Sequence, residues 1–356
     1  TSASGVEEVR QAAVLLATGC RERPRAARLV PGDRPPGVLT TGELQQRVYL
    51  GGERLAGRAV VVGAEHVSFS AAVTLAHAGA RVIALVTEHE RQQSYAAFRL
   101  GAALRWGVPV LTSSAVTRVT GVGGRLASVD VTDVADVAGG RARTVACDWL
   151  VFTGDWIPDH ALARSADLAL DAGTRGPAVD GGLATSAPGV FAAGNLIHAA
   201  ETADVAALSG RHAARQIDAF LAGRASPAGP RIPVVVDSPL RWISPNAISA
   251  GRVPPPLGRF TLRTGECRRP ARLEARQDGR LLARSRPLRL IPGRPLHLRA
   301  SWLAQVNPVG GPVRVEVENS KRLPTTRPYR QRGSARDRPG RGDLLCSARL
   351  HSVRGS

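Results

Sequence analysis

The residues best suited to contact a ligand lie within 185–202, T-S-A-P-G-V-F-A-A-G-N-L-I-H-A-A-E-T. This pattern predicts a short buried strand, a glycine turn and the start of a helix, an arrangement that brings backbone amides and a helix N-terminus to an anionic or electron-rich ligand. Gly194 leaves room for a ligand, and Asn195 offers a short amide side chain at the strand end. Thr202 is placed to cap a helix that begins near Ala203. The same pattern also fits an ordinary strand-to-helix turn of an α/β protein.

The segment T-S-A-P-G-V-F-A-A-G-N resembles the second flavin motif of the pyridine nucleotide-disulfide oxidoreductase superfamily, whose members have two dinucleotide-binding domains. The resemblance implies an FAD cofactor, with Gly194 and Asn195 at its ribityl and phosphate part. It also implies that Glu201, Thr202 and Ala203 lie near the flavin ring. Most relatives carry Asp where this chain has Asn195, so this chain keeps the hydrogen bonding without the charge.

A second match lies near the start of the chain, where residues 12–24 read A-A-V-L-L-A-T-G-C-R-E-R-P. The apolar run predicts a buried strand that ends in a tight turn at Thr18 and Gly19. It resembles the A-T-G motif at which the flavin domain passes into an inserted domain. The extension over 21–46 resembles the subgroup with the α subunits of sarcosine and opine oxidases, hydrogen cyanide synthase and dye-linked proline dehydrogenase. That resemblance implies oxidation of a C–N bond in an amine or amino acid.

Residues 55–88 predict a βαβ unit. Its expected strand, helix and strand lie at 59–62, 66–78 and 81–86. An NAD(P) site requires G-x-G-x-x-G at the first turn, but here Glu65 and Ser68 stand in place of the glycines that should follow Gly63. Glu65 puts a carboxylate where a pyrophosphate should lie, while Glu88 ends the second strand, where an acid would bind a ribose hydroxyl. We therefore expect weak NAD(P) binding, if any, at Gly63 and Glu88, and the departure argues against a disulfide reductase.

Motifs and composition predict an α/β chain in several parts. The expected parts are a partial FAD-binding Rossmann-like domain (1–52 and 159–222), an inserted NAD(P)-type Rossmann domain (53–158), a small antiparallel β domain (231–317) and a disordered basic tail (318–356). A helical segment is expected at 94–106, and hairpins at 115–134 and around the D-G at 278–279. Residues 1–11 contain neither a strand pattern nor a G-x-G-x-x-G loop. We therefore expect a fragment that binds FAD weakly or not at all, from a protein that is a flavoenzyme when intact.

Cysteine spacing excludes two kinds of site. Cys20, Cys147, Cys267 and Cys346 lie far apart, so the sequence has no C-x-x-C redox pair and no zinc-binding spacing. The pattern is typical of a reduced protein, and we expect a cytoplasmic location. No metal site and no catalytic residue is predicted. His198 lies between the glycine turn and the helix start, so it is a candidate to contact the ring or the substrate, although a lone histidine is usually structural.

Charge is concentrated in the last third of the chain, where 226–356 carry 26 basic and 8 acidic side chains, against 22 and 21 in 1–225. Nucleic-acid binding through an arginine-rich face is therefore a rival interpretation. Against it, the chain has no nucleic-acid motif, and aromatic residues make up only 4% of it, which leaves few rings for stacking on bases. No apolar run approaches the ~20 residues needed to span a bilayer.

Together these features predict an FAD-dependent oxidoreductase that transfers hydride from the carbon next to nitrogen to the flavin. The expected partners are an amine or amino-acid substrate and, as electron acceptor, a partner subunit, a quinone or oxygen. The alternatives are an NAD(P)H-dependent flavin reductase, a non-catalytic scaffold subunit and an arginine-rich binding protein. The prediction depends on one juxtaposition, because the turns at 18–19 and 194–195 must fold side by side.

Overall fold

The computed structural model describes residues 5–6, 8–95, 107–136, 142–199, 201–224 and 229–318. The described residues, which end at Glu318, form one compact unit. The helical segment expected at 94–106 and the basic tail expected at 318–356 lie almost entirely outside the described residues. Besides the helices and strands below, the described chain has short helical turns at Arg25–Arg28, Gln46–Leu50, Val134–Asp136, Gly194–Leu196, Pro256–Gly258 and Leu303–Gln305.

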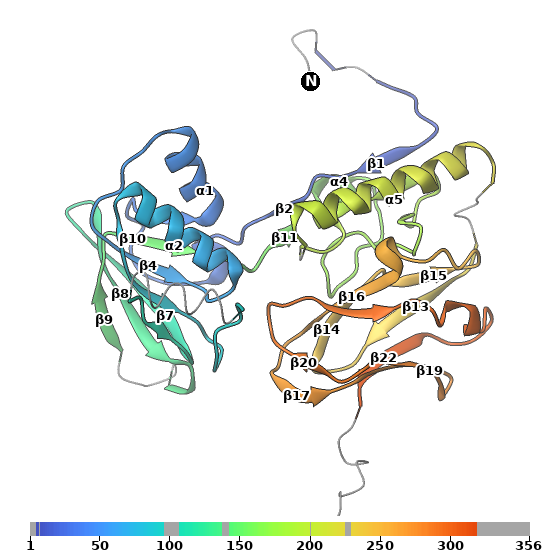
Figure 1. The fold of residues 1–356 in the computed structure, drawn as a ribbon. Coiled ribbons are helices and arrows are strands. Elements are labelled where there is room, and N and C mark those ends of the chain that lie inside the picture. Colours follow the sequence, from blue (N-terminus) through green and yellow to red (C-terminus); the bar gives the residue numbers. More distant parts are fainter. Residues whose placement is uncertain are drawn as a thin grey trace, which may run out of the picture. The chain divides into compact units, whose positions relative to one another are not determined.

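Two short parallel strands carry the predicted ligand turns. Strand β1 (Val14–Leu16; labelled in Figure 1) pairs with β12 (Val190–Ala192). The prediction that the strand at 14–16 is buried is wrong, because it pairs only with β12 in the described chain and Val14 and Leu15 are 43% and 40% exposed. Helix α5 (Ala203–Leu221) follows β12 and packs back on it, with the rings of Phe191 and Phe220 edge to face. Among the helices of the described part, none is both long and apolar enough to cross a membrane.

The chain leaves this strand pair and returns to it through a second, antiparallel pair, β2 (Cys20–Arg21) and β11 (Ile157–Pro158). The short helix α4 (Ala161–Ser165) follows the return. Arg28, just beyond β2, donates to the carbonyls of Thr153 and Gly154 at 2.9 Å and lies over the ring of Phe152. These contacts join the outgoing and returning segments.

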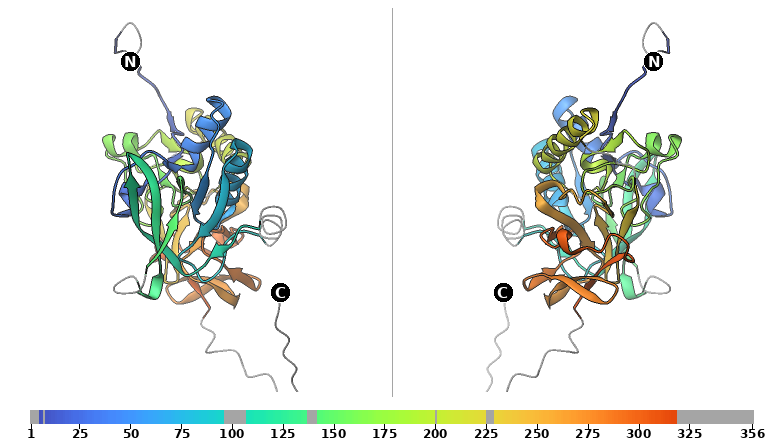
Figure 2. Two further views of the ribbon diagram at one scale, coloured as in Figure 1. Left: turned by 90° about the vertical axis from the view of Figure 1, so that its left-hand side faces the viewer. Right: turned by 90° about the vertical axis from the view of Figure 1, so that its right-hand side faces the viewer.

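The chain between β2 and β11 forms a five-stranded sheet, ordered β3-β10-β4-β5-β6 and parallel throughout. Its strands are β3 (Val38–Thr40), β10 (Trp149–Phe152), β4 (Arg58–Val62), β5 (Arg81–Val86) and β6 (Val110–Leu111). Helix α2 (His66–Ala78) joins β4 to β5, which confirms the βαβ unit. Apolar side chains of α1 (Thr41–Gln45) and α2 cover one face of the sheet, and the antiparallel strands β7 (Ser114–Val122), β8 (Arg125–Asp133) and β9 (Arg143–Ala146) cover the other (Figure 2).

One predicted boundary differs from the structure. Residues 38–50 lie within the predicted flavin-domain segment 1–52, but β3 pairs with β10 in the five-stranded sheet. Leu44 of α1 is fully buried in the same core as Leu75 of α2. The apolar side chains of this stretch therefore complete the inserted domain.

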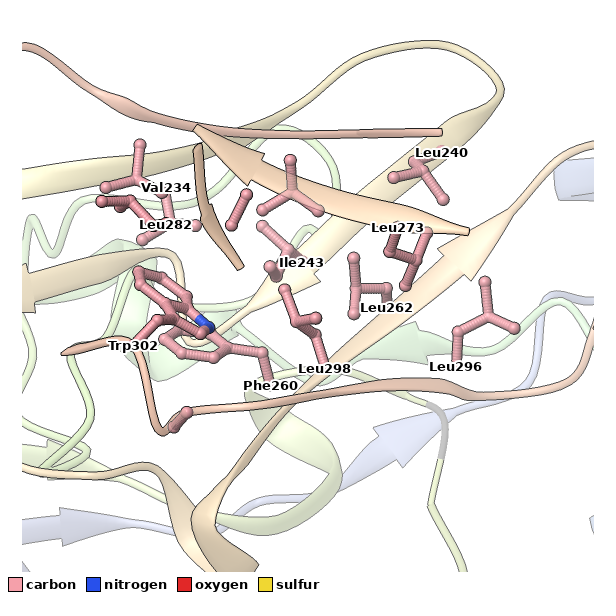
Figure 3. Close-up of a cluster of buried hydrophobic side chains, with 14 of the residues drawn as sticks. Val234, Leu240, Ile243, Phe260, Leu262, Leu273, Leu282, Leu296, Leu298 and Trp302 are labelled. Atoms are coloured by element: carbon pink, nitrogen blue, oxygen red, sulfur yellow. The ribbon is translucent and has the colours of Figure 1, made fainter. Parts of the chain in front are cut away.

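Residues 231–317 form strands that pack around one apolar core (Figure 3). One sheet is ordered β15-β13-β22-β18-β19, a second β14-β16-β21, and β17 pairs with β20. The strands are β13 (Arg231–Val236), β14 (Leu240–Ser244), β15 (Ala247–Ser249), β16 (Arg259–Thr264), β17 (Arg268–Ala271), β18 (Leu273–Gln277), β19 (Arg280–Arg284), β20 (Leu288–Leu290), β21 (Leu296–Arg299) and β22 (Val313–Val317). The hairpin at 278–279 is confirmed, but the purely antiparallel arrangement is wrong, because β13 and β22 run parallel.

Candidate functional site

The turns after β1 and β12 lie side by side, which confirms the juxtaposition on which the sequence prediction depends. Leu16 is paired with Ala192, and the amide of Ala193 donates to the carbonyl of Leu16 at 3.0 Å. Because the strands are parallel, both turns leave the same edge of the pair. This is the edge of an α/β sheet at which ligands bind.

The turn at 18–19 is hydrogen-bonded to Asp159, in the segment that follows β11. The hydroxyl of Thr18 donates to the carbonyl of Asp159 at 2.7 Å, and the amide of Asp159 donates to the carbonyl of Gly19 at 2.9 Å. The φ of Gly19 is +76°, a left-handed conformation that favours glycine. The side chain of Thr18 thus stabilises the contact between the segments that leave and re-enter the flavin-type domain.

The second turn owes its shape to Gly194 and Asn195. Gly194 has a φ of +68°, and a Cβ added there would meet only the Cβ of Ala206, at 3.8 Å, so space remains beside it. The side-chain amide of Asn195 donates to the carbonyl of Glu201 and accepts from the amide of Glu201, both at 3.1 Å. An Asp at this position could not make the first of these bonds, which explains the amide here.

The start of α5 differs in detail from the prediction. Thr202 occupies the N-cap position, but its hydroxyl donates to the carboxylate of Asp204 and makes no bond to the helix amides. The predicted side-chain cap is therefore wrong. That hydrogen bond lowers the pKa of Asp204. Thr202 and Ala203 are exposed, so the first turn of the helix is open to a ligand.

In the inserted domain, the carboxylate of Glu65 occupies the turn after β4, at 63–68, where a dinucleotide would bind. Gly63 and Glu88 lie near the ends of neighbouring parallel strands, as predicted. The carboxylate of Glu65 accepts from the hydroxyl of Thr153 at 2.7 Å and from the amide of Ala64 at 3.0 Å. A carboxylate held at this turn repels a pyrophosphate, which supports the expectation of weak NAD(P) binding.

The C-terminal strands contribute side chains that are not among the predicted site residues. Thr261 on β16 donates to the carboxylate of Glu201 at 3.2 Å. The ring of His198 stacks on Trp242 of β14, with centroids 5.5 Å apart and planes 18° apart. Arginines and apolar residues alternate in G-R-F-T-L-R at 258–263, but Thr261 of this run is buried and meets Glu201. The alternating pattern indicates a strand at β16, but the sequence does not indicate which segment that strand contacts.

Burial sets the charge state of this region. It lowers the pKa of His198 to about 4, with a further contribution from the charge of Arg263. The pKa of His297, on β21, is also lowered to about 4 by burial and by nearby arginines. Burial lowers the pKa of Arg263 to about 10, against the charges of Glu201 and Glu65. At neutral pH both imidazoles are therefore uncharged and Arg263 is a cation.

The comparison with protein families agrees with this arrangement of turns. The pyridine nucleotide-disulphide oxidoreductase family model matches residues 1–210, more than half of the chain. The chain belongs to this family. Members of this oxidoreductase family typically bind FAD. No curated protein matches the sequence.

Solved structures that are similar to this chain include three thioredoxin reductases. That of T. acidophilum is 18% identical with a TM-score of 0.48, over 60% of this chain and 66% of its own. Those of Lactococcus lactis and Giardia duodenalis are 16% and 22% identical, with TM-scores of 0.47 and 0.38, each over 59% of this chain and 66% of its own. The chain thus spans just under two thirds of the length of these proteins.

The cysteines of the described residues do not form a redox pair. Cys20, Cys147 and Cys267 are free thiols. Burial raises the pKa of Cys147 to about 12, so this side chain is protonated at neutral pH. Cys346 lies outside the described residues. The described part of this family member therefore offers no dithiol for disulfide exchange.

Proposed function

We propose that this chain serves an FAD-dependent oxidoreductase that oxidises the C–N bond of an amine or amino acid. The observation that carries the flavin part is the pairing of β1 with β12, which brings the turns at 18–19 and 194–195 to one edge. The space beside Gly194 and the exposed first turn of α5 fit a flavin there. The substrate part rests on the resemblance of residues 21–46 to the amine-oxidising subgroup.

Each residue has a separate task in this proposal. FAD supplies the acceptor for a hydride from the carbon next to nitrogen. Thr18, Gly19, Gly194 and Asn195 bind its ribityl and phosphate part, and Glu201, Thr202 and Ala203 lie near the ring. The partial positive charge at the α5 N-terminus stabilises negative charge on the reduced ring. The electrons pass to a partner subunit, a quinone or oxygen, and the protein acts in the cytoplasm.

The arrangement at Glu65 disfavours the alternative, an NAD(P)H-dependent flavin reductase. Such an enzyme has to hold a pyrophosphate at the turn that the Glu65 carboxylate fills. We therefore assign the inserted domain a structural role, in which α2 and the sheet keep the Rossmann arrangement without a bound nucleotide.

Titration of the chain into FAD, followed by flavin fluorescence anisotropy, tests the flavin assignment. We expect weak binding that Asn195→Ala weakens by about tenfold, because the variant loses two hydrogen bonds that hold the Glu201 backbone. Gln216→Ala on the same helix is the matched control and should leave the affinity unchanged. Equal affinities of Asn195→Ala and the parent chain would contradict the assignment.

A further inference from the structure

A two-stranded ribbon of the C-terminal β domain carries exposed arginines. In this ribbon β17 pairs with β20, and neither pairs with another strand of the described chain (both are labelled in Figure 1). Leu288 and Leu290 of β20 pack at the apolar core, so the side chain of Arg289 between them points away from it. The register of the two strands places Arg269 and Pro270 opposite Arg289.

Three arginines of this ribbon have no ion-pair partner among the described residues. They are Arg269, Arg286 and Arg289, the ribbon arginines, and all three are exposed. The carboxylate closest in sequence to Arg269 is that of Glu266, but it pairs with Arg268 at 3.1 Å. The ribbon therefore presents guanidinium groups whose charge no carboxylate of the described chain neutralises.

A fourth cation lies close to the ribbon arginines. Burial lowers the pKa of Arg294, and the charge of Arg269 acts in the same direction, so these two cations repel each other. Arg294 donates to the backbone carbonyls of Gln93 and Ser94, which are neutral groups. Like charges on neighbouring strands destabilise a sheet, and carboxylates of a partner would relieve that repulsion.

The sheet next to the ribbon differs, because its arginines are neutralised within the domain. The carboxylate of Glu274 on β18 accepts from two of them, at 2.7 and 2.6 Å. Four arginines in or beside that sheet have such a partner, and the pairs are Arg276 and Arg284 with Glu274, Arg272 with Glu318, and Arg314 with Asp237. The unpaired charge of the ribbon is therefore a local property, and not only a consequence of the many arginines in this domain.

The surface around the ribbon arginines favours a protein as their partner over a nucleic acid. The rings of Pro270 and Pro287 are exposed beside them. Arginine together with apolar surface is typical of protein–protein interfaces. Binding of a nucleic-acid strand relies on exposed aromatic rings that stack on bases, whereas the aromatic rings of the described β domain, at Trp242, Phe260 and Trp302, are buried or half-buried.

We propose that the ribbon arginines dock a protein partner that presents a cluster of Asp and Glu side chains. Each guanidinium forms charge-assisted hydrogen bonds with a carboxylate of the partner, and the two proline rings contact its apolar side chains. The surface uses none of the residues assigned to FAD. The inference thus goes beyond the proposed function and does not depend on it.

Fluorescence anisotropy of a labelled peptide of about ten glutamates, titrated with the full chain at about 50 mM salt, tests the proposal. The triple variant Arg269→Gln/Arg286→Gln/Arg289→Gln should bind the peptide at least about tenfold more weakly, because three charge-assisted contacts are lost. Since all three side chains are exposed, urea unfolding of the variant should match that of the parent chain, which establishes that it folds.

A second triple variant is the matched control. Arg118→Gln/Arg125→Gln/Arg143→Gln removes three exposed arginines from β7, β8 and β9 of the inserted domain and lowers the net charge of the chain equally. We expect it to weaken peptide binding by less than about twofold, because only the long-range attraction changes.

Three outcomes would overturn the proposal. They are no binding of the peptide by the parent chain at about 1 mM, equal losses for the two triple variants, and a larger loss for an oligonucleotide of about ten thymidines than for the peptide. The last result would assign the ribbon to nucleic acid. Since the titration contains no flavin, each of these results leaves the FAD assignment to its own test.

Discussion

Acidification should destabilise this protein, and the buried imidazole of His198 should account for a measurable part of the loss. Burial lowers its pKa from 6.5 to about 4, and the charges of Arg263 and His297 act in the same direction. The ring is stacked on Trp242 and is only 8% exposed. The unfolded chain binds a proton here at a pH where the folded chain does not.

The magnitude follows from the size of the pKa shift. Because the folded-state pKa is the lower one, the free energy of unfolding is unaffected above pH 6.5 and falls as the pH drops toward 4. Each pH unit in that window costs about 1.4 kcal/mol, so His198 accounts for a loss of about 3 kcal/mol by pH 4. Below that pH both states are protonated and the loss stops growing.

Urea unfolding at pH 7 and pH 4.5, followed by tryptophan fluorescence, measures this loss. We expect the free energy of unfolding of His198→Gln to fall by about 2–3 kcal/mol less between these pH values than that of the parent chain. His89→Gln removes an exposed histidine and should keep the parent's pH dependence. The reasoning is wrong if all three proteins lose the same free energy.

Four further variants test other parts of the structure. Gly194→Ala forces a non-glycine residue to a φ of +68° without a clash, so urea unfolding should show a loss of about 1–2 kcal/mol and no more. Arg28→Ala loses two hydrogen bonds and the contact with Phe152, so the free energy of unfolding should fall by about 2–3 kcal/mol, and an unchanged value would refute the role of Arg28 as a fastening. Trp302→Ala removes a fully buried ring from the C-terminal core (Figure 3) and should cost about 3–5 kcal/mol in the same assay. Glu65→Gly should raise the affinity for NADPH by at least about tenfold in a fluorescence titration, and unchanged affinity would show that the carboxylate is not what weakens binding.

Local sequence patterns predicted several elements of the fold. The apolar run at 14–16 and the run that ends at Gly194 predicted two strands with glycine turns, and the structure pairs them. The helix at 66–78 matches its predicted bounds because it lies between a glycine turn and Gly79, whose φ of +101° ends it. These features depend on neighbouring residues, which is why the sequence alone predicts them.

Contacts between distant segments were not predictable in the same way. Thr261 and Glu201 are 60 residues apart, and no local pattern indicates that a strand of the β domain meets the loop before α5. The parallel pairing of β13 with β22 likewise joins segments far apart in the sequence. The hydroxyl of Thr202 donates to the carboxylate of Asp204 and accepts from no helix amide, and which of these bonds forms depends on side-chain conformation.

The central claim is that the turns after β1 and β12 together form one wall of a flavin site. Hydrogen–deuterium exchange with and without FAD tests it most directly. We expect FAD to slow exchange in peptides that cover 14–21 and 190–205 and to leave the turn at 63–68 unchanged. Slowed exchange at 63–68 with no effect at the other two segments would contradict the claim.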